Sequence, residues 1–410
     1  MKVIVTLFLG LISAFNLGCT TSEEFPFGIW RGVLETESGV KIPFNFEVLE
    51  SYDARTVYLI NGKERLKVDE VVVNQDSVFF RFKLFDSEIK AKRTSSGLTG
   101  KWIKRLADKN SEMDFTAQPG TNWRFFNNSE KIKPSLSGRW AAVFKSTTSK
   151  DSTIAVGEFS QLNEKLTGTF LTATGDYRYL EGSINSNKIY LSAFDGSSAY
   201  LFTGDLSSDS LITNGLFYSG VSSVKDWTAR KDDNAKLADG EEITKLKSAQ
   251  DPLTFSFPDL NGKKVALSDA RFKNKIVIVQ FLGSWCPNCM DETAYLTSFY
   301  DKFKDKGVEI IGLAYERTND FNRSRERVMQ LKERFNIQYP ILLTGYTNKE
   351  VLRSMPQLEK FKAFPTTFVV DKKGRVRKIH SGFTGPGTGK HYEEFVNQFE
   401  TEIRDLLKEP

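Results

Sequence analysis

The spacing of apolar residues changes once along this chain of 410 residues, just before Asp251. From about Phe25 to Arg230, apolar and polar side chains alternate, most clearly from Val40 to Val48 and from Phe80 to Leu84. A period of two predicts antiparallel strands that each bury one face. From Asp251 onward, short apolar runs alternate with helix-like patterns, which predicts an α/β sheet domain. We therefore expect a multidomain protein in which an all-β part precedes an α/β part.

The all-β part looks duplicated, because similar segments recur at nearly constant offsets. The corresponding pairs are Gly28-Ile29-Trp30 with Gly138-Arg139-Trp140, Asn74 to Ser87 with Asn185 to Gly196, and Asp114-Phe115-Thr116-Ala117 with Asp226-Trp227-Thr228-Ala229. Repeated β units of this size are typical of small barrels or sandwiches. We expect one unit at residues 25–120 and a second at 134–230. A spacer role is favoured for them over a substrate-docking or dimerisation surface.

The rest of the chain divides into a linker and the α/β domain. Residues 231–250 are charged and poor in aromatic side chains, which indicates a linker with room for one short helix. The domain itself is expected at 251–410, with the almost wholly apolar run Ile276 to Leu282 as its central buried strand. The other expected elements are a strand at 253–257 before an Asn261-Gly262 turn, a helix from about Pro287, a strand at 308–313, a helix at about 322–335, a short strand at 339–343, a broken helix at 349–361, strands at 367–370 and 376–380, and an amphipathic last helix carrying Tyr392 to Leu406.

The N-terminus has the organisation of an export signal. Lys2 precedes an apolar run from Val3 to Leu17, and a small residue, a cysteine and a polar segment follow. The ending Gly18-Cys19 resembles a bacterial lipobox, although Asn16 stands where lipoboxes usually carry an aliphatic residue. An ordinary signal peptide or an uncleaved anchor is the alternative interpretation.

The lipobox resemblance implies a protein of the bacterial cell envelope. It implies a lipoprotein signal peptide at 1–18, diacylation of Cys19 as the mature N-terminus, and a tether at 19–24. Thr20 is not an aspartate, which by the same resemblance disfavours retention in the inner membrane. We therefore expect a lipid-anchored, periplasm-facing protein, with the outer membrane favoured over the inner and surface exposure as a further alternative.

Charge and histidine content exclude several functions. The net charge is only +5, and basic and acidic residues alternate between 301 and 306, so the sequence has no basic stripe for nucleic acid. The two histidines, His380 and His391, lie apart from other ligand types. A histidine-based metal site and a Ser-His-Asp triad are therefore not expected.

The chain has three cysteines. If Cys19 is lipidated, the remaining thiols are Cys286 and Cys289, and an exported protein with only these has no structural disulfide. The pair is therefore expected to serve chemistry as a redox disulfide. Half of a zinc site is disfavoured, because the sequence has no second Cys or His pair to complete it.

The segment around the pair gives each residue a role. Cys286 falls at the start of the expected helix, where free backbone N–H groups and the helix dipole favour a thiolate, so it is the expected nucleophile. Cys289 lies on the helix face that points into the core and is the expected resolving thiol. Glu292 follows on that face, where burial would raise its pKa and allow it to act as a general base toward Cys289. The alternative is an exposed Glu292 that only favours the first helical turn.

Two motifs carry a resemblance to a known family. Trp285-Cys286-Pro287-Asn288-Cys289, together with Phe364-Pro365-Thr366-Thr367-Phe368, resembles the TlpA/ResA-type branch of the thioredoxin superfamily over about Asp251 to Glu409. The resemblance implies a cis Pro365 that lies against the cysteines, and client contacts at Trp285, Phe364, Pro365 and Thr366. It also implies an active-site acid at Glu292. Thioredoxin carries a buried Asp where this chain has Gln280, so the thioredoxin proton route is absent.

The family resemblance implies thiol-disulfide exchange with no metal or organic cofactor. Client proteins of the cell envelope would be reduced, and a membrane electron-donor protein would recharge the enzyme. A disulfide oxidase or isomerase of the same fold stays open, as does a lipoprotein whose β units bind a ligand or partner. A thiol peroxidase is disfavoured, because Val279 and Gly283 stand where peroxiredoxins carry proline and threonine.

Overall fold

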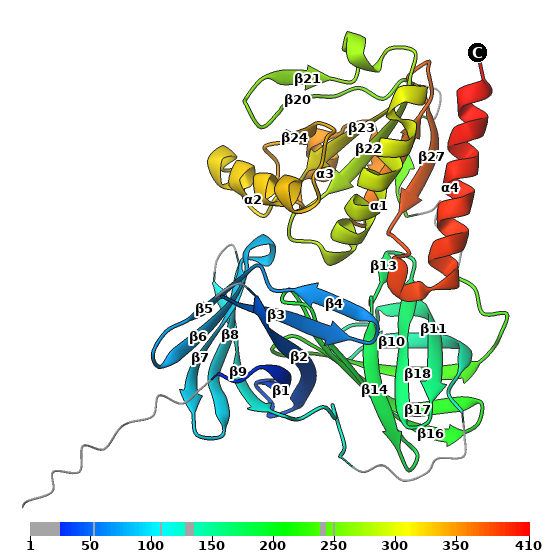
Figure 1. Cartoon of the computed structure of the whole chain (residues 1–410). Coiled ribbons are helices and arrows are strands. Elements are labelled where there is room, and N and C mark those ends of the chain that lie inside the picture. The colour runs from blue at the N-terminus through cyan, green and yellow to red at the C-terminus, as the bar shows by residue number, and fades with distance from the viewer. Residues whose placement is uncertain (1–24, 52–53, 107–108, 128–134, 238–242, 249–250) are drawn as a thin grey trace, which may run out of the picture.

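The computed structural model describes residues 25–51, 54–106, 109–127, 135–237, 243–248 and 251–410. Figure 1 shows two β units side by side and, above them, a domain of helices and strands. The expected signal peptide, the lipidation site Cys19 and the tether lie outside the described residues. In these ranges no helix combines the length and the apolar character needed to cross a bilayer.

The first β unit is one antiparallel sheet of nine strands. Its strands are β1 (Gly28–Glu35), β2 (Lys41–Ser51), β3 (Ala54–Asn61), β4 (Glu64–Lys67), β5 (Glu70–Val73), β6 (Ser77–Phe82), β7 (Ser87–Thr94), β8 (Gly97–Arg105) and β9 (Asn110–Pro119), with a 3-10 turn η1 (Lys83–Phe85). Their order is β4-β3-β2-β1-β9-β8-β7-β6-β5, and within the described residues no ladder joins β4 to β5. The sheet is therefore a half-barrel whose alternate side chains form a core, as the pattern in β6 shows.

The second β unit has the same strand count and closes further. Its strands are β10 (Gly138–Ser146), β11 (Ser152–Leu162), β12 (Lys165–Thr172), β13 (Gly175–Asp176), β14 (Leu180–Asn185), β15 (Lys188–Phe194), β16 (Ala199–Ser208), β17 (Leu211–Ser219) and β18 (Ser223–Lys231). The order is β11-β10-β18-β17-β16-β15-β14-β12-β13, and a ladder between β11 and β12 closes the sheet into a barrel. Its core is rich in aromatic rings, such as the stacked pair Phe202 and Phe217 at 4.2 Å.

Corresponding residues hold equivalent places in the two units. The indole N–H groups of Trp30 and Trp140 each donate to the carbonyl four residues earlier, at 2.9 Å in both cases. Phe115 and Trp227 each lie on the last strand of their unit, paired with its first strand. The expected duplication of an all-β unit is confirmed.

The C-terminal domain is built on a five-stranded mixed sheet. Its strands are β22 (Ile276–Leu282), β23 (Val308–Ala314), β24 (Ile341–Leu343), β26 (Thr366–Val370) and β27 (Val376–Ser381), in the order β24-β23-β22-β26-β27. One face packs against α1 (Pro287–Phe303), α2 (Phe321–Arg334) and α4 (Lys390–Lys408); the other packs against α3 (Val351–Ser354) and the hairpin of β20 (Ser256–Pro258) and β21 (Lys264–Ala266). Short 3-10 turns are η3 (Ala270–Phe272), η4 (Lys304–Lys306) and η5 (Pro386–Thr388). The expected α/β domain with Ile276–Leu282 at its centre is confirmed.

One expectation for this domain was wrong in detail. The broken helix expected at 349–361 is helical only in α3, and its second half is the strand β25 (Leu358–Lys360). The partner of that strand, β19 (Lys245–Leu246), lies in the expected linker, part of which falls outside the described residues. Pairing between segments so far apart in the sequence overrides the local helical pattern.

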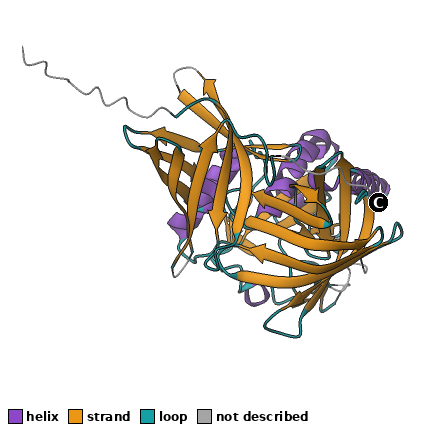
Figure 2. Cartoon of the chain, turned by 90° about the horizontal axis from the view of Figure 1, so that it is seen from below, coloured by secondary structure: helices purple, strands orange, loops and turns teal. Residues whose placement is uncertain are grey.

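The three parts share buried surface. Phe194 belongs to the second unit but packs in the core of the first, with ring centroids 4.6 Å from Phe44, 5.7 Å from Phe82 and 5.3 Å from Trp102. Figure 2, seen from below, shows the strands of both units lying against each other. The two β units therefore pack against each other and share a hydrophobic core, instead of being separate domains joined only by a linker.

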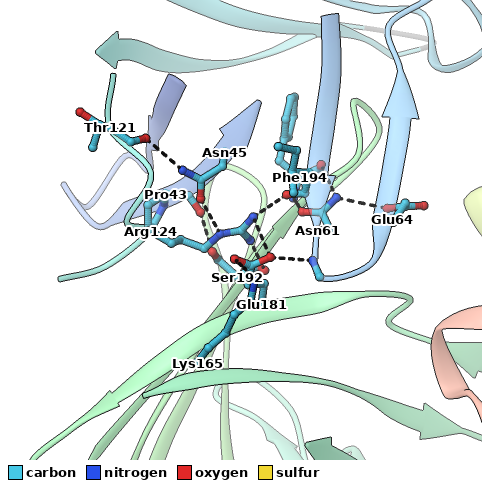
Figure 3. A network of polar contacts seen from close by, with 12 residues as sticks. Pro43, Asn45, Asn61, Glu64, Thr121, Arg124, Lys165, Glu181, Ser192 and Phe194 are labelled. Atoms are coloured by element: carbon cyan, nitrogen blue, oxygen red, sulfur yellow. Dashed lines mark hydrogen bonds and ion pairs between the residues drawn. The ribbon is translucent and has the colours of Figure 1, made fainter. Parts of the chain in front are cut away.

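A buried arginine joins the units as well (Figure 3). Arg124 follows β9, and its guanidinium donates to the Asn45 side chain at 3.2 Å and to the Ser192 carbonyl at 2.9 Å. It also lies 3.9 Å from Glu181, whose carboxylate accepts a hydrogen bond from the Gly62 N–H at 2.8 Å. Because a buried charge must be satisfied on all sides, this network fixes how the units meet.

Candidate redox site

The cysteine pair lies just beyond the carboxyl end of the central strand, β22. All seven side chains of β22 are buried, and the strand ends at Leu282 in a tight loop before α1. Gly283 is required in this loop, because a Cβ there would lie 2.2 Å from the indole nitrogen of Trp285. Cys286 is the N-cap of α1 and Pro287 its first residue, as the sequence predicts.

Both thiols are free, and their surroundings differ. Cys286 is 6% exposed, and its Sγ accepts a hydrogen bond from the Cys289 N–H at 3.3 Å. Cys289 is fully buried, and burial together with the hydrogen bond to the Cys286 thiol raises its pKa well above the usual range. The Cys286 sulfur therefore lies among the backbone N–H groups at the start of α1, while burial keeps the proton on Cys289.

Glu292 is buried beneath the pair. Its carboxylate accepts hydrogen bonds from the Gln280 amide and from the Thr367 hydroxyl, both at 2.8 Å. Burial raises the pKa of Glu292 to about 7, although both hydrogen bonds oppose the shift. The exposed position considered as an alternative is wrong, and a carboxyl that titrates near neutrality can exchange a proton with a neighbouring thiol. Gln280 holds this acid in place at the position where thioredoxin carries an aspartate.

The loop before β26 lies against Cys286. The Phe364–Pro365 peptide bond is cis, and the Phe364 carbonyl lies 3.6 Å from the Cys286 Sγ. The ring of Trp285 meets that of Phe364 edge to face at 5.7 Å. Thr366 is placed differently from the other expected client contacts, because its side chain is fully buried and its hydroxyl donates to the Ala363 carbonyl at 2.8 Å.

Two residues that follow the neighbouring strand β23 support the loop between β22 and α1, and sequence reasoning missed both of them. The buried carboxylate of Glu316 accepts from the Ser284 N–H at 2.9 Å and from the Ser284 hydroxyl at 2.7 Å. The guanidinium of Arg317 lies over the Trp285 ring at 5.0 Å. Their position just after an apolar parallel strand was the available signal, since functional groups gather where such strands end.

The second β unit reaches the site too. The Asn288 side chain donates to the Asp176 carbonyl at 3.2 Å, and the Arg178 guanidinium donates to the Pro287 carbonyl at 3.2 Å. Between this segment and Cys286 lies a cavity of about 240 Å³. More than a hundred residues separate the two sides in the sequence, so no local pattern could have predicted the contact.

The described residues contain no group of His, Cys, Asp and Glu side chains arranged to hold a metal ion.

Comparison with known proteins places the C-terminal domain among thiol-disulfide enzymes. Residues 245–394 match the Redoxin family. The thiol-disulfide oxidoreductase ResA of Bacillus subtilis (strain 168) is 30% identical over 164 residues, which cover 40% of this chain and 80% of that protein. ResA of a Bacillus cereus strain is 32% identical over 132 residues, covering 32% of this chain and 68% of that protein. Among solved structures, the thioredoxin domain of a thiol-disulfide oxidoreductase from Bacteroides vulgatus is 29% identical with a TM-score of 0.28, and the match covers 37% of this chain and 100% of that one.

Proposed function

This chain belongs, through its C-terminal thioredoxin-like domain, to the ResA thiol-disulfide oxidoreductases, and we propose that it is a membrane-tethered reductase of disulfides in exported proteins. The observation that carries the proposal is the pair of free thiols at the start of α1, with Cys286 at the N-cap and Cys289 fully buried behind it. This asymmetry suits one attacking thiol and one resolving thiol.

The first step is the attack of the Cys286 thiolate on one sulfur of a client disulfide. The client S–S bond breaks, a mixed disulfide forms between Cys286 and the client, and the other client sulfur leaves as a thiolate. The N–H of Cys289 lies against the Cys286 Sγ and solvates its negative charge before the attack. Trp285, Phe364 and the cis Pro365 line the approach to this sulfur and contact the client.

The second step releases the client. Cys289 attacks the Cys286 sulfur, the mixed disulfide breaks, and the client leaves with both sulfurs reduced while a Cys286–Cys289 disulfide forms. The Cys289 proton must go elsewhere first, and the carboxylate of Glu292, with a pKa of about 7, is the group placed to accept it. The exchange uses sulfur and protons alone and needs no metal or organic cofactor.

The site of action follows from the N-terminal pattern. A diacylated Cys19 would hold the protein in the bacterial envelope facing the periplasm, in the outer membrane in preference to the inner. Its partners there would be client proteins with disulfides and a membrane electron donor that returns the Cys286–Cys289 disulfide to the dithiol.

The equilibrium redox potential tests the direction of the reaction. We would titrate the chain from Phe25 onward against glutathione and dithiothreitol, alkylate the free thiols and read the oxidised fraction, with Cys286→Ser as the blank. A potential near or below that of thioredoxin, about −270 mV, is expected for a reductase. A value above about −180 mV would make the protein an oxidase or isomerase.

A further inference from the structure

Residues 172–178 of the second unit, which connect β12 to β14, lie on the opposite side of the redox site from the C-terminal sheet. We call this segment the wall. Its tip contacts the residues between the two cysteines. Gly175 has a φ of +130°, and a Cβ there would lie 2.1 Å from the Asn288 amide nitrogen. The neighbouring Asp176 carbonyl accepts the Asn288 hydrogen bond. Only glycine allows the wall to approach this closely.

A mostly enclosed arginine anchors the base of the wall. The guanidinium of Arg178 forms an ion pair with Asp291 of α1 at 3.2 Å and a second with Glu64 of the first unit at 2.5 Å. Its side chain is 11% exposed, and it also donates to the Pro287 carbonyl. All three parts of the molecule therefore meet at one residue, next to the helix that Cys286 caps.

The loop that leads into α4 holds the wall from the other side. The Asp176 carboxylate accepts from the Gly385 N–H at 2.6 Å. A Cβ on Gly382 would lie 2.6 Å from the backbone of Thr174, and one on Gly387 would lie 2.8 Å from the backbone of Arg178. Backbone packs directly on backbone here, so the wall is a fixed part of the site.

The space left beside Cys286 is small. The cavity of about 240 Å³ is bounded by Cys286 and Phe364 on one side and by Thr174, Tyr177 and Tyr200 on the other. Pockets for drug-sized ligands usually measure about 300 to 1,000 Å³. An extended peptide segment can enter such a slot, whereas the surface of a folded protein would collide with the wall before its disulfide reached the thiol.

We propose that the wall is a specificity determinant that admits disulfides carried on extended, unfolded polypeptide and excludes disulfides on folded surfaces. This rests on the exchange chemistry proposed above and narrows its clients to chains that have not yet folded. Under this proposal, the second β unit forms part of the substrate site, so the β units do more than space the catalytic domain from the membrane.

The test compares two disulfides in single turnovers of the reduced protein, which need no electron donor. One probe is a short unstructured peptide closed by one disulfide, and the other is insulin, a folded protein with an exposed disulfide. The measured quantity is the ratio of the second-order rate constants, peptide over insulin. Arg178→Ala removes the anchor and Gly175→Ala forces the tip off Asn288; each should lower this ratio by about tenfold, equivalent to about 1.4 kcal/mol in relative activation free energy.

Arg139→Ala is the matched control, because Arg139 also links the second unit to the C-terminal domain, through His391, but away from Cys286. This variant should keep the wild-type ratio. The proposal is overturned if the folded variants Arg178→Ala and Gly175→Ala keep that ratio, or if Arg139→Ala lowers it equally. Oxidised glutathione distinguishes failure of the proposed exchange chemistry from failure of the proposed role of the wall. If oxidised glutathione cannot oxidise the reduced wild-type protein, the protein has no exchange activity and the proposed function itself is wrong.

Discussion

Removing the Thr367 hydroxyl should shift the titration of Glu292 upward. Thr367 is buried, and its hydroxyl donates to the Glu292 carboxylate at 2.8 Å. Thr367→Val keeps the shape of the side chain and removes a donor that stabilises only the charged form of the acid. A hydrogen bond to a charged group contributes about 1.5 to 3 kcal/mol, and one pKa unit corresponds to about 1.36 kcal/mol. The pKa of Glu292, about 7 in the wild type, should therefore rise by roughly one to two units.

Two readouts follow that shift. The carboxyl carbon resonance of Glu292, in protein labelled with ¹³C at the glutamate side-chain carboxyl and assigned by its loss in Glu292→Gln, gives the pKa directly. The pH profile of client release from the mixed disulfide should move by the same amount, because fewer Glu292 side chains are ionised at neutral pH to accept the Cys289 proton.

Thr366→Val is the matched control for this experiment. Thr366 is the neighbouring residue on β26 and is equally buried, but its hydroxyl donates to the Ala363 carbonyl. This variant should leave the Glu292 resonance titrating as in the wild type. An unchanged or lowered Glu292 pKa in Thr367→Val would refute the reasoning, as would an equal rise in both variants.

Three further predictions concern the thiols, pH and the core. Cys289→Ser should accumulate a mixed disulfide with the client, seen as a shifted band on a non-reducing gel; Cys286→Ser should give none, and a band in that control would reverse the assigned roles. The folded protein holds the Glu292 proton more tightly than an unfolded chain, since the pKa rises from 4.5 to about 7, so this group alone should contribute a loss of about 3 kcal/mol of stability as the pH rises from 4 to 8. Glu292→Gln should lack that loss in denaturant unfolding, and parallel pH curves for the two proteins would contradict it. Phe194→Ala should cost about 3 to 5 kcal/mol and split the calorimetric unfolding of the two β units into separate transitions, whereas an unchanged single transition would show that this ring does not couple them.

The elements that carry the redox pair could be predicted because their signals are local. A continuous apolar run marked β22, and Pro287 beside Cys286 marked the start of α1. Burial of Glu292 followed from helical spacing alone. The duplication of the β units could be predicted because tryptophans and glycines recur at nearly the same offsets in the two units.

What escaped prediction depends on contacts between distant segments. Strand β25 forms because β19 of the expected linker pairs with it, and neither segment has a strong pattern of its own. The Arg178 side chain looks like any exposed arginine in the sequence, yet it is only 11% exposed and lies between two acids from other parts of the fold. Only the tertiary structure brings these groups together, because the position of a charged residue in the sequence does not indicate which distant residue it will pair with.

The anchoring of Arg178 also means that the thioredoxin-like domain is not a portable module. A fragment that begins at Asp251 would lose the partners of Asn288, Asp291 and the Pro287 carbonyl, and water would replace the wall beside Cys286. Redox potential and thiolate stability depend on the dielectric and the hydrogen bonds around the sulfur. The redox potential of the Cys286–Cys289 couple should therefore differ between the fragment and the whole chain. If the domain were fused to another protein, it would keep the exchange reaction and lose the client selectivity.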